Sequence, residues 1–182
     1  MKTFTEAKPF VENPRYQEKR EEALSRLNFH IIDAPIVDII EGYATIPHCF
    51  SLQSCYGHFV HKGQKNPKNI EPLSNYNEGS KVEYRIAYMA FCIQNNDSGR
   101  KLYHDLEAIT KIDTDYIQFG SANWFWQRNV NSYVLQVEPD RHKTEDSVFV
   151  GIDEALHLEK VRDQMFEALR RILQEHQQLV SK

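Results

Sequence analysis

The strongest constraint on the fold is a single apolar stripe at helical spacing in the last part of the chain, residues 153–180. Its members are Leu158, Val161, Met165, Leu169, Ile172 and Leu179, and charged residues lie on the opposite side of the helix. Because a helix rises about 1.5 Å per residue, about 25 residues would span roughly 38 Å. A stripe of this length must be covered by a sheet of the same chain or by a partner. The sequence therefore predicts a long C-terminal helix that packs on a sheet or forms a homodimer.

Strand-like runs account for much of the remaining chain. They cover residues 49–54, 82–94, 116–126, 131–138 and 147–151. Helical spacing marks residues 14–28, and two aspartates have the place of N-caps: Asp33 before a short apolar helix that ends at Gly42, and Asp97 before a longer one. This order predicts an α+β fold in a single domain, residues 1–182. We expect a mixed or antiparallel sheet of about five strands with helices on one face.

Length and composition exclude several classes of protein. With 182 residues, of which 41% are hydrophobic and 12% aromatic, the chain can bury a core and is not disordered. Its apolar runs fall short of the ~20 residues of a membrane span, and its first residues lack the apolar region of a signal peptide. Three cysteines, an odd number, argue against a disulfide scaffold. We therefore expect a cytoplasmic protein with no membrane partner.

Charge is unevenly distributed along the chain. The net charge is −4, with 22 basic and 26 acidic residues, which is not the balance of a basic nucleic-acid coat protein. Residues 42–70 nevertheless contain no Asp or Glu, and they hold Lys62, Lys65 and Lys68. This asymmetry favours a local anion site at which the three lysines bind phosphate groups. The alternative is a solvated loop that happens to carry lysines.

The segment from His48 to His58 concentrates the residues that can carry chemistry. In one interpretation, Cys55 or Cys49 is a nucleophile and a histidine is its base. In a second, Cys55 and His58 bind a metal ion, and Cys49 or His48 completes the site. The spacing of these residues matches no familiar zinc finger, and we assign no metal from the sequence.

The favoured interpretation of this segment uses its backbone. Gly57 can adopt a positive φ, so the turn after Ser54 would direct several N–H groups into one hollow, where they bind an anion. The small side chains of Ser54 and Cys55 allow a ligand to approach closely. This is also the only one of the three interpretations that gives Lys62, Lys65 and Lys68 a role, which is to attract the anion. We therefore predict ligand-binding roles for Ser54, Tyr56, Gly57 and His58.

A second candidate binding feature is the pair Trp124 and Trp126. In a strand, alternation would place both rings on one face, next to Arg128, where they could stack a flat ring or a base. This interpretation makes both tryptophans ligand-binding residues. The alternative is that the two rings pack beneath the C-terminal helix, since Trp is usually largely buried.

Several motifs along the chain occur together in a known family. They are Phe4 and Lys8, Asp33 followed by the apolar segment 34–40, a strand ending in Ser54-Cys55-Tyr56-Gly57-His58, a helix over 98–109 and a strand with Phe119-Gly120-Ser121. In this order they resemble the TYW3 family, the tRNA wybutosine-synthesising methyltransferases. Asp33, Ser54, Cys55 and Gly57 match the family pattern, whereas Tyr56 and His58 stand where the family has a serine and an arginine.

The resemblance implies a protein that uses S-adenosylmethionine to methylate a ring nitrogen of a modified guanine in tRNA. It implies catalytic roles for Asp33 and Cys55, with the methyl donor held near the turn 54–57. A tRNA or nucleotide ligand would stack a base on one of the two tryptophans, and the three lysines would meet its phosphates. The alternative is a non-enzymatic ligand-binding or protein-interaction module that uses the long C-terminal helix.

Overall fold

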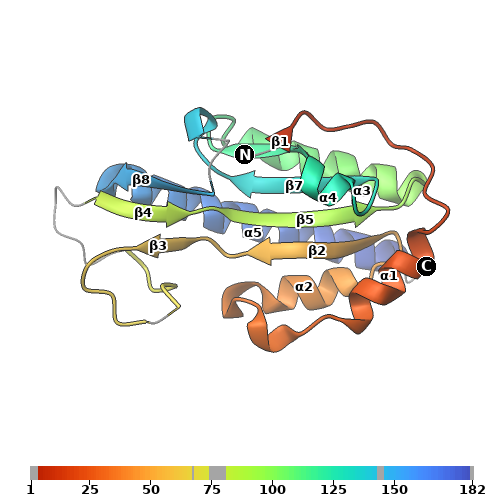
Figure 1. Ribbon diagram of the computed structural model, residues 1–182, viewed down its shortest axis with the longest axis horizontal. Coiled ribbons are helices and arrows are strands. Elements are labelled where there is room, and N and C mark those ends of the chain that lie inside the picture. Colours follow the sequence, from red (N-terminus) through yellow and green to blue (C-terminus); the bar gives the residue numbers. More distant parts are fainter. Residues whose placement is uncertain (1–3, 67, 74–80, 143–145, 181–182) are drawn as a thin grey trace.

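The computed structural model describes residues 4–66, 68–73, 81–142 and 146–180. Two antiparallel sheets lie end to end along the long axis of the molecule (Figure 1). The larger has the order β1 (Phe4–Thr5), β6 (Ile117–Ala122), β7 (Ser132–Val137), β5 (Ala87–Ile93) and β2 (Cys49–Cys55). The smaller has the order β3 (His58–Val60), β4 (Lys81–Arg85) and β8 (Ser147–Gly151). Together with the helices, these sheets confirm the predicted α+β class.

The chain passes twice from one sheet to the other at the same place. β4 and β5 are separated by Ile86 alone, whose N–H donates to the carbonyl oxygen of Asp146 at 3.2 Å. The sequence had predicted one continuous strand over residues 82–94. β2 and β3 are separated by Tyr56 and Gly57. Both interruptions fall at one junction, because a side chain added at Gly57 would meet Ala87, the first residue of β5.

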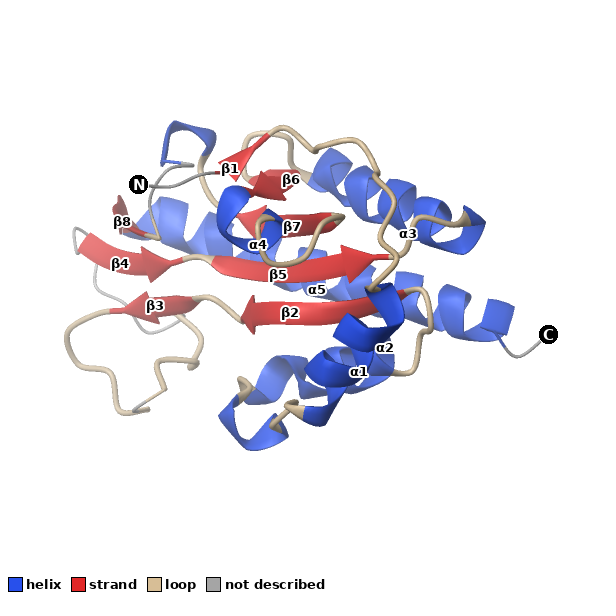
Figure 2. Ribbon diagram, turned by 45° about the vertical axis from the view of Figure 1, so that its right-hand side comes forward, coloured by secondary structure: helices blue, strands red, loops and turns tan. Residues whose placement is uncertain are grey.

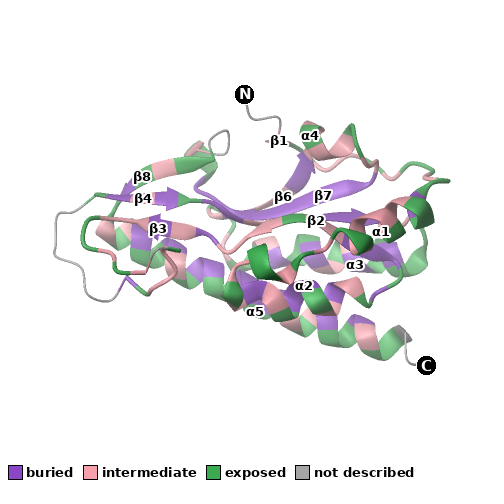
Figure 3. Ribbon diagram, turned by 60° about the horizontal axis from the view of Figure 1, so that its bottom comes forward, coloured by how far each residue is buried: buried purple, intermediate pink, exposed green. Residues whose placement is uncertain are grey.

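Three helices cover one face of the sheets: α2 (Val37–Ala44), α3 (Asp97–Ala108) and α5 (Ile152–Val180) (Figure 3). The predicted stripe of α5 faces inward, and its first four members, from Leu158 to Leu169, are buried in the main core. Ile172 is half-buried, and Leu179 is exposed near the end of the helix. The sheets and neighbouring helices of the same chain therefore cover most of the stripe. Of the six members of the stripe, Ile172 and Leu179 remain accessible, so a homodimer through α5 stays a prediction that would have to use the last turns of the helix.

The helix α1 (Tyr16–Ser25), predicted over residues 14–28, packs against the other face at one corner. Tyr16 forms a small cluster there with Phe50 and Cys92, and the rings of Tyr16 and Phe50 lie 5.6 Å apart. Side chains alternate between the faces of a strand, so Phe50 points away from the main core that contains Cys49. α1 and α2 both contact the edge strand β2, and both lie below it in the view of Figure 2.

Short elements account for the local differences from the sequence predictions. The 3₁₀-helices are η1 (Phe29–Ile31), η2 (Ala34–Ile36), η3 (Ile109–Ile112) and η4 (Asp140–His142). Asn96 caps α3 in place of the predicted Asp97, and its side chain accepts the N–H of Gly99 at 2.8 Å. The strand predicted over 116–126 ends at Ala122, where the short helix α4 (Asn123–Trp126) begins. None of the helices in the described part of the chain is long and apolar enough to span a membrane.

Candidate functional site

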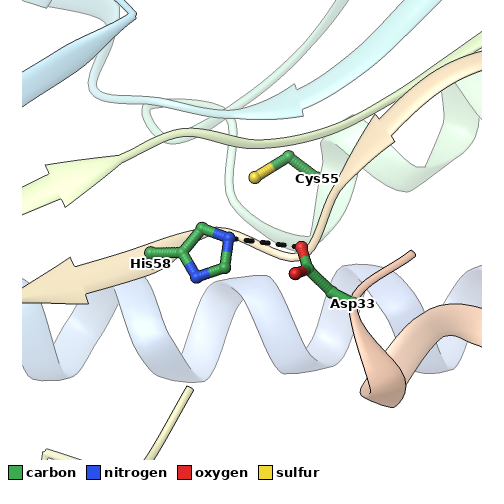
Figure 4. A group of neighbouring side chains, drawn as sticks. All are labelled: Asp33, Cys55 and His58. Atoms are coloured by element: carbon green, nitrogen blue, oxygen red, sulfur yellow. Dashed lines mark ion pairs between the residues drawn. The ribbon is translucent and has the colours of Figure 1, made fainter. Parts of the chain in front are cut away.

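Asp33, Cys55 and His58 come together where the two sheets join (Figure 4). Asp33 precedes η2, Cys55 is the last residue of β2, and His58 is the first residue of β3. One side-chain donor atom from each residue lies within 4.8 Å of the other two, and all three side chains are half-buried. The fold thus joins Asp33 to Cys55 and His58, which follow it by 22 and 25 positions in the sequence, into one cluster, here called the Asp33–Cys55–His58 cluster.

The carboxylate of Asp33 has a different role from the predicted one. Its side chain does not cap the following helix. One oxygen, Oδ2, accepts the backbone N–H of Tyr56 at 2.9 Å and lies 3.2 Å from Nε2 of His58. Asp33 is therefore a tertiary anchor that attaches the start of η2 to the turn between β2 and β3.

The turn has the predicted backbone shape, but its N–H groups already have acceptors. Gly57 adopts φ +88°, as the sequence suggested, and an added Cβ would lie 2.7 Å from the Cβ of Ala87. The N–H of Tyr56 donates to Asp33, and the N–H of Gly57 donates to Sγ of Cys55 at 3.4 Å. The prediction that these amides bind an external anion is wrong, because the anion at the turn is a carboxylate of the chain itself.

His58 carries a proton on each ring nitrogen. Nδ1 lies 2.8 Å from the carbonyl oxygen of Lys68, which can only accept, and Nε2 faces the carboxylate of Asp33. The hydrogen bond to Asp33, followed by one to Cys55, raises the pKa of His58 from 6.5 to about 10. Burial acts to raise the pKa of Asp33, but the hydrogen bonds from His58 and Tyr56 lower it overall. His58 is thus a cation at neutral pH and, without loss of a proton, is not a base for Cys55.

Helix α5 supports the turn through Arg162, which the sequence analysis did not single out. Its guanidinium lies 3.9 Å over the ring of Tyr56 and donates to the carbonyl oxygen of Gly57 at 3.2 Å. Arg162 is only 4% exposed, and the hydroxyl of Tyr56 donates to Asp163 at 2.9 Å. A signal for Arg162 was present, since it lies four residues after Leu158 and three before Met165, within the apolar stripe.

A hollow of about 840 Å³ opens beside the turn, over the outer side of α5. Pro35 and Tyr56, which are close neighbours of Asp33 and Cys55 in the sequence, line one part of it, and Ile112 of η3 lines another. Charged residues of both signs come from α5: Lys160, Arg170 and Arg171, and Glu159, Asp163 and Glu167. The hollow is therefore adjacent to the Asp33–Cys55–His58 cluster and has a mixed electrostatic character.

The predicted phosphate-binding lysines lie in the loop after β3. Lys62, Lys65 and Lys68 are all exposed. Lys68 is close to the cluster, because its carbonyl oxygen contacts His58 and its charge helps to lower the pKa of Asp33. Of the three lysines, Lys68 is thus the one with a direct contact to the Asp33–Cys55–His58 cluster.

The tryptophans lie elsewhere, and they do not belong to the strand that the sequence predicted. Trp124 and Trp126 belong to α4, so strand alternation does not apply. Trp124 is 59% exposed, with Arg128 stacked 3.3 Å from its ring centre, whereas Trp126 is half-buried beside Tyr133. The strand pairing places α4 beyond the end of the sheet that contains Phe50, whereas Cys55 is at the opposite end of β2. The predicted joint role of the tryptophans and the turn in one ligand site is therefore wrong.

The other predicted residues of the segment 48–58 do not join the Asp33–Cys55–His58 cluster. Ser54 is half-buried and pairs with Met89 on β5. Cys49 and His48 are buried at the far end of β2, where Cys49 faces the carbonyl oxygen of Tyr43 and His48 contacts His176. Neither residue can therefore complete a site with Cys55.

Comparisons with known proteins show a likeness in fold. No model of a protein family and no curated protein matches the chain. The structure titled PH1069 protein from Pyrococcus horikoshii is similar with a TM-score of 0.50 and 13% identity, over 88% of this chain and 93% of that one. A second structure, of the PH1069 protein from strain OT3, has a TM-score of 0.43 and 14% identity, covering 93% and 94%. A hypothetical protein from Aeropyrum pernix has a TM-score of 0.41 and 11% identity, covering 82% and 100%. At 13% identity, the likeness to the first of these shows a shared fold and says nothing about activity.

Proposed function

We propose that this chain is a TYW3-like methyltransferase that transfers a methyl group from S-adenosylmethionine to a tRNA base or another nucleoside-type ligand. One observation carries the proposal: the residues behind the resemblance, distant in sequence, form one hydrogen-bonded unit beside a hollow. Asp33 holds the turn that contains Cys55 and Gly57, and Tyr56 of the same turn lines the hollow. A motif whose parts converge in this way supports a functional role better than its separate pieces do.

The charge at His58 removes one objection to the resemblance. The family has an arginine at this position, and a histidine would ordinarily be neutral at pH 7. Here the contact with Asp33 raises the pKa of His58 to about 10, so the position stays cationic. The cation is already engaged, however, because both ring N–H groups have partners within the chain. In this proposal His58 and Asp33 are therefore positioning residues rather than catalytic residues.

The lining of the hollow suits a ligand with charges of both signs. S-adenosylmethionine carries a carboxylate, an ammonium, a sulfonium and a flat adenine ring. The hollow offers three basic and three acidic side chains, together with the surfaces of Pro35 and Tyr56. Basic side chains there would attract the carboxylate, and acidic ones the ammonium and the sulfonium. A purely basic hollow would instead favour a phosphate alone.

The reaction demands little chemistry from the protein. The lone pair of a ring nitrogen forms a bond to the methyl carbon while the carbon–sulfur bond breaks, and its electron pair returns to sulfur as S-adenosylhomocysteine leaves. Because the sulfonium is already activated, proximity and in-line orientation supply most of the rate. In this proposal Lys62, Lys65 and Lys68, which are exposed, contact the phosphates of the nucleic acid. They would contribute binding that weakens with salt.

Isothermal titration calorimetry with S-adenosylmethionine and S-adenosylhomocysteine tests the proposal. The variant Gln164→Trp places a large ring in the hollow, and Gln174→Trp introduces the same ring on an exposed position of the same helix that does not line the hollow. We expect binding by the unmodified chain and by Gln174→Trp, and at least a tenfold loss in Gln164→Trp. No heat with either ligand at millimolar concentration would rule out the methyltransferase.

Transfer of a radiolabelled methyl group to tRNA that lacks the final guanine modification then tests the acceptor. Label that stays in the donor, despite binding in the hollow, would exclude this tRNA as the substrate. The interaction-module alternative receives no comparable support, since most of the apolar stripe that it required is buried within the chain.

A further inference from the structure

We propose that Asp33, Cys55 and His58 bind one Zn²⁺ ion through a carboxylate oxygen, the thiolate sulfur and Nε2 of the imidazole. The three donor atoms already lie within 4.8 Å of one another, and the carboxylate and imidazole atoms are 3.2 Å apart. In a tetrahedral zinc site with bonds of about 2.0–2.3 Å, neighbouring ligand atoms are separated by roughly 3.3–3.8 Å. The arrangement therefore needs a small contraction rather than a rearrangement. This inference goes beyond the proposed methyl transfer and does not depend on it.

The three ligands are held by backbone that the fold keeps in place. Cys55 pairs with Tyr88 in the larger sheet, and His58 pairs with Arg85 in the smaller one. Asp33 is anchored by the N–H of Tyr56. A site assembled on strand ends loses little conformational entropy when the ion binds, which favours affinity.

Each ligand also has the outer contact that metal ligands usually require. Nδ1 of His58 donates to the carbonyl oxygen of Lys68 at 2.8 Å, which directs Nε2 toward the other two ligands. Cys55 accepts the N–H of Gly57 on its sulfur, and Asp33 accepts the N–H of Tyr56. These hydrogen bonds orient the donors and stabilise negative charge on sulfur and oxygen. The N–H groups of the turn 54–57 thus donate to the carboxylate of Asp33 and the sulfur of Cys55. They would support these two groups as anionic ligands of a zinc ion.

The charges balance when the ion binds. Zn²⁺ takes the place of the Nε2 proton that joins His58 to Asp33, and a thiol proton on Cys55 is released to solvent as well. One carboxylate and one thiolate then neutralise the two positive charges, beside a neutral imidazole. The set of one sulfur, one nitrogen and one oxygen favours zinc over magnesium or calcium, which prefer oxygen ligands alone. Three protein ligands leave a fourth position for water or a substrate atom, as catalytic zinc sites do.

Cobalt substitution tests the site, because Co²⁺ reports its own ligands. The full chain is freed of metal by a chelator, and Co²⁺ is added while the absorption spectrum is recorded. We expect one equivalent to give the visible bands of tetrahedral cobalt and a cobalt–thiolate charge-transfer band, both abolished by one equivalent of Zn²⁺. The unmodified chain alone decides this outcome: octahedral bands, or no thiolate band at all, would overturn the proposal.

Ligand variants identify the donors. Cys55→Ser should remove the charge-transfer band, and Asp33→Asn and His58→Gln should each weaken cobalt binding at least tenfold. The matched controls His104→Gln and Asp115→Asn alter exposed residues outside the cluster and should bind as the unmodified chain does. Circular dichroism checks that each variant is folded. A thiolate band that persists in folded Cys55→Ser would assign the metal to another cysteine and contradict the site.

The same metal-free protein distinguishes this proposal from the methyltransferase. Heat from S-adenosylmethionine measured without metal concerns the hollow alone, whereas the cobalt spectrum concerns the cluster alone. Either result can therefore fail while the other stands.

Discussion

The carboxylate of Asp33 accepts the backbone N–H of Tyr56 at 2.9 Å across 23 residues of sequence. Through this bond, the turn between β2 and β3 binds a carboxylate of the same chain in place of an external anion. It also brings Asp33 to His58, and the resulting ion pair is partly screened from water because both side chains are less than a fifth exposed. The anchoring of the turn, the charge of His58 and the proposed metal site all depend on this one placement.

Asp33→Asn should lower the pKa of His58 and destabilise the protein. The amide still offers an oxygen to Tyr56, but the negative charge that favours the imidazolium is gone. We expect the pKa of His58, followed by NMR titration of metal-free protein, to fall from about 10 toward its ordinary 6.5. The free energy of unfolding should fall by about 1–2 kcal/mol, as for a partly buried hydrogen bond to a charged group. Asp115→Asn serves as the control, and an unchanged pKa in Asp33→Asn would contradict the assigned ion pair.

His58 should stabilise the metal-free protein at neutral pH and lose that effect in alkali. Its pKa is raised in the folded state, so the folded state binds more protons between pH 6.5 and about 10. The contribution is fully present below pH 6.5 and disappears as the pH rises through 10. Urea unfolding of the unmodified chain and of His58→Gln at several pH values measures it. The difference between the two proteins should shrink with rising pH, and a constant difference would count against the ion pair.

His48 should have the opposite pH dependence. Burial, followed by the neighbouring charge of His176, lowers the pKa of His48 from 6.5 to about 4. The unfolded chain therefore binds more protons between these values, and the free energy of unfolding should fall as the pH drops from 6.5 to 4, by at most about 1.4 kcal/mol per pH unit. His176 lies between His48 and Asp105 and stays in place in His48→Gln. Denaturant unfolding should show a shallower acid loss in that variant, while exposed His104→Gln should retain the slope.

Two glycines offer a matched test of the turn. Gly57 and Gly63 both have positive φ, at +88° and +97°, but a Cβ at Gly57 would meet the backbone of Ala87, whereas one at Gly63 would meet nothing within 4 Å. Gly63→Ala should cost about 1 kcal/mol, the strain of a left-handed alanine. Gly57→Ala should cost about 2–4 kcal/mol, because overpacking adds to that strain. Equal losses in chemical denaturation would show that the close approach to Ala87 is absent.

The three cysteines should differ in reactivity. Burial raises the pKa of the Cys49 thiol strongly and that of Cys92 to about 12, and both are fully buried, whereas Cys55 is partly exposed. In native, metal-free protein, a thiol reagent should therefore label Cys55 first, followed by the other two on unfolding. Cys55→Ala should cost less than about 1 kcal/mol, and Cys92→Ala more than that, since truncation of a buried side chain leaves a cavity. Mass spectrometry of labelled peptides and urea unfolding check the two expectations.

Sequence predictions were correct where the structure depends on residues that are neighbours along the chain. The 3.6-residue spacing from Leu158 to Leu169 predicted α5, and it also indicated which face is buried. The strands predicted over residues 49–54 and 147–151 correspond to β2 and β8, whose ends differ from the predicted ones by at most one residue. Trp124 and Trp126 were misassigned because their spacing of two is also compatible with a short helix after a strand, and the local sequence does not show that β6 ends at Ala122.

The candidate site was predictable only in part. The positive φ of Gly57 follows from its residue type, and Asp33, Ser54, Cys55 and Gly57 were marked by the resemblance. The partners of the turn were not predictable. An N–H group donates to any nearby oxygen or sulfur, and a one-dimensional pattern does not say that a carboxylate from another segment will be the nearest acceptor. The role of Arg162 was not predictable for a similar reason. A charged residue within an apolar stripe has a function only through its partners, which here are the ring of Tyr56 and the carbonyl oxygen of Gly57.

The sequence by itself determined the periodic elements, the glycine turn and the stock of residues able to carry chemistry, because these depend on neighbours along the chain. Only the tertiary structure decided that Asp33 meets Cys55 and His58, that the tryptophans lie at the other end of the larger sheet, and that most of the apolar stripe of α5 is covered from within. The physical reason is that hydrogen bonds, charges and apolar contacts act over a few ångströms in space. Their partners are therefore chosen by how the sheets and helices pack, and not by separation along the sequence.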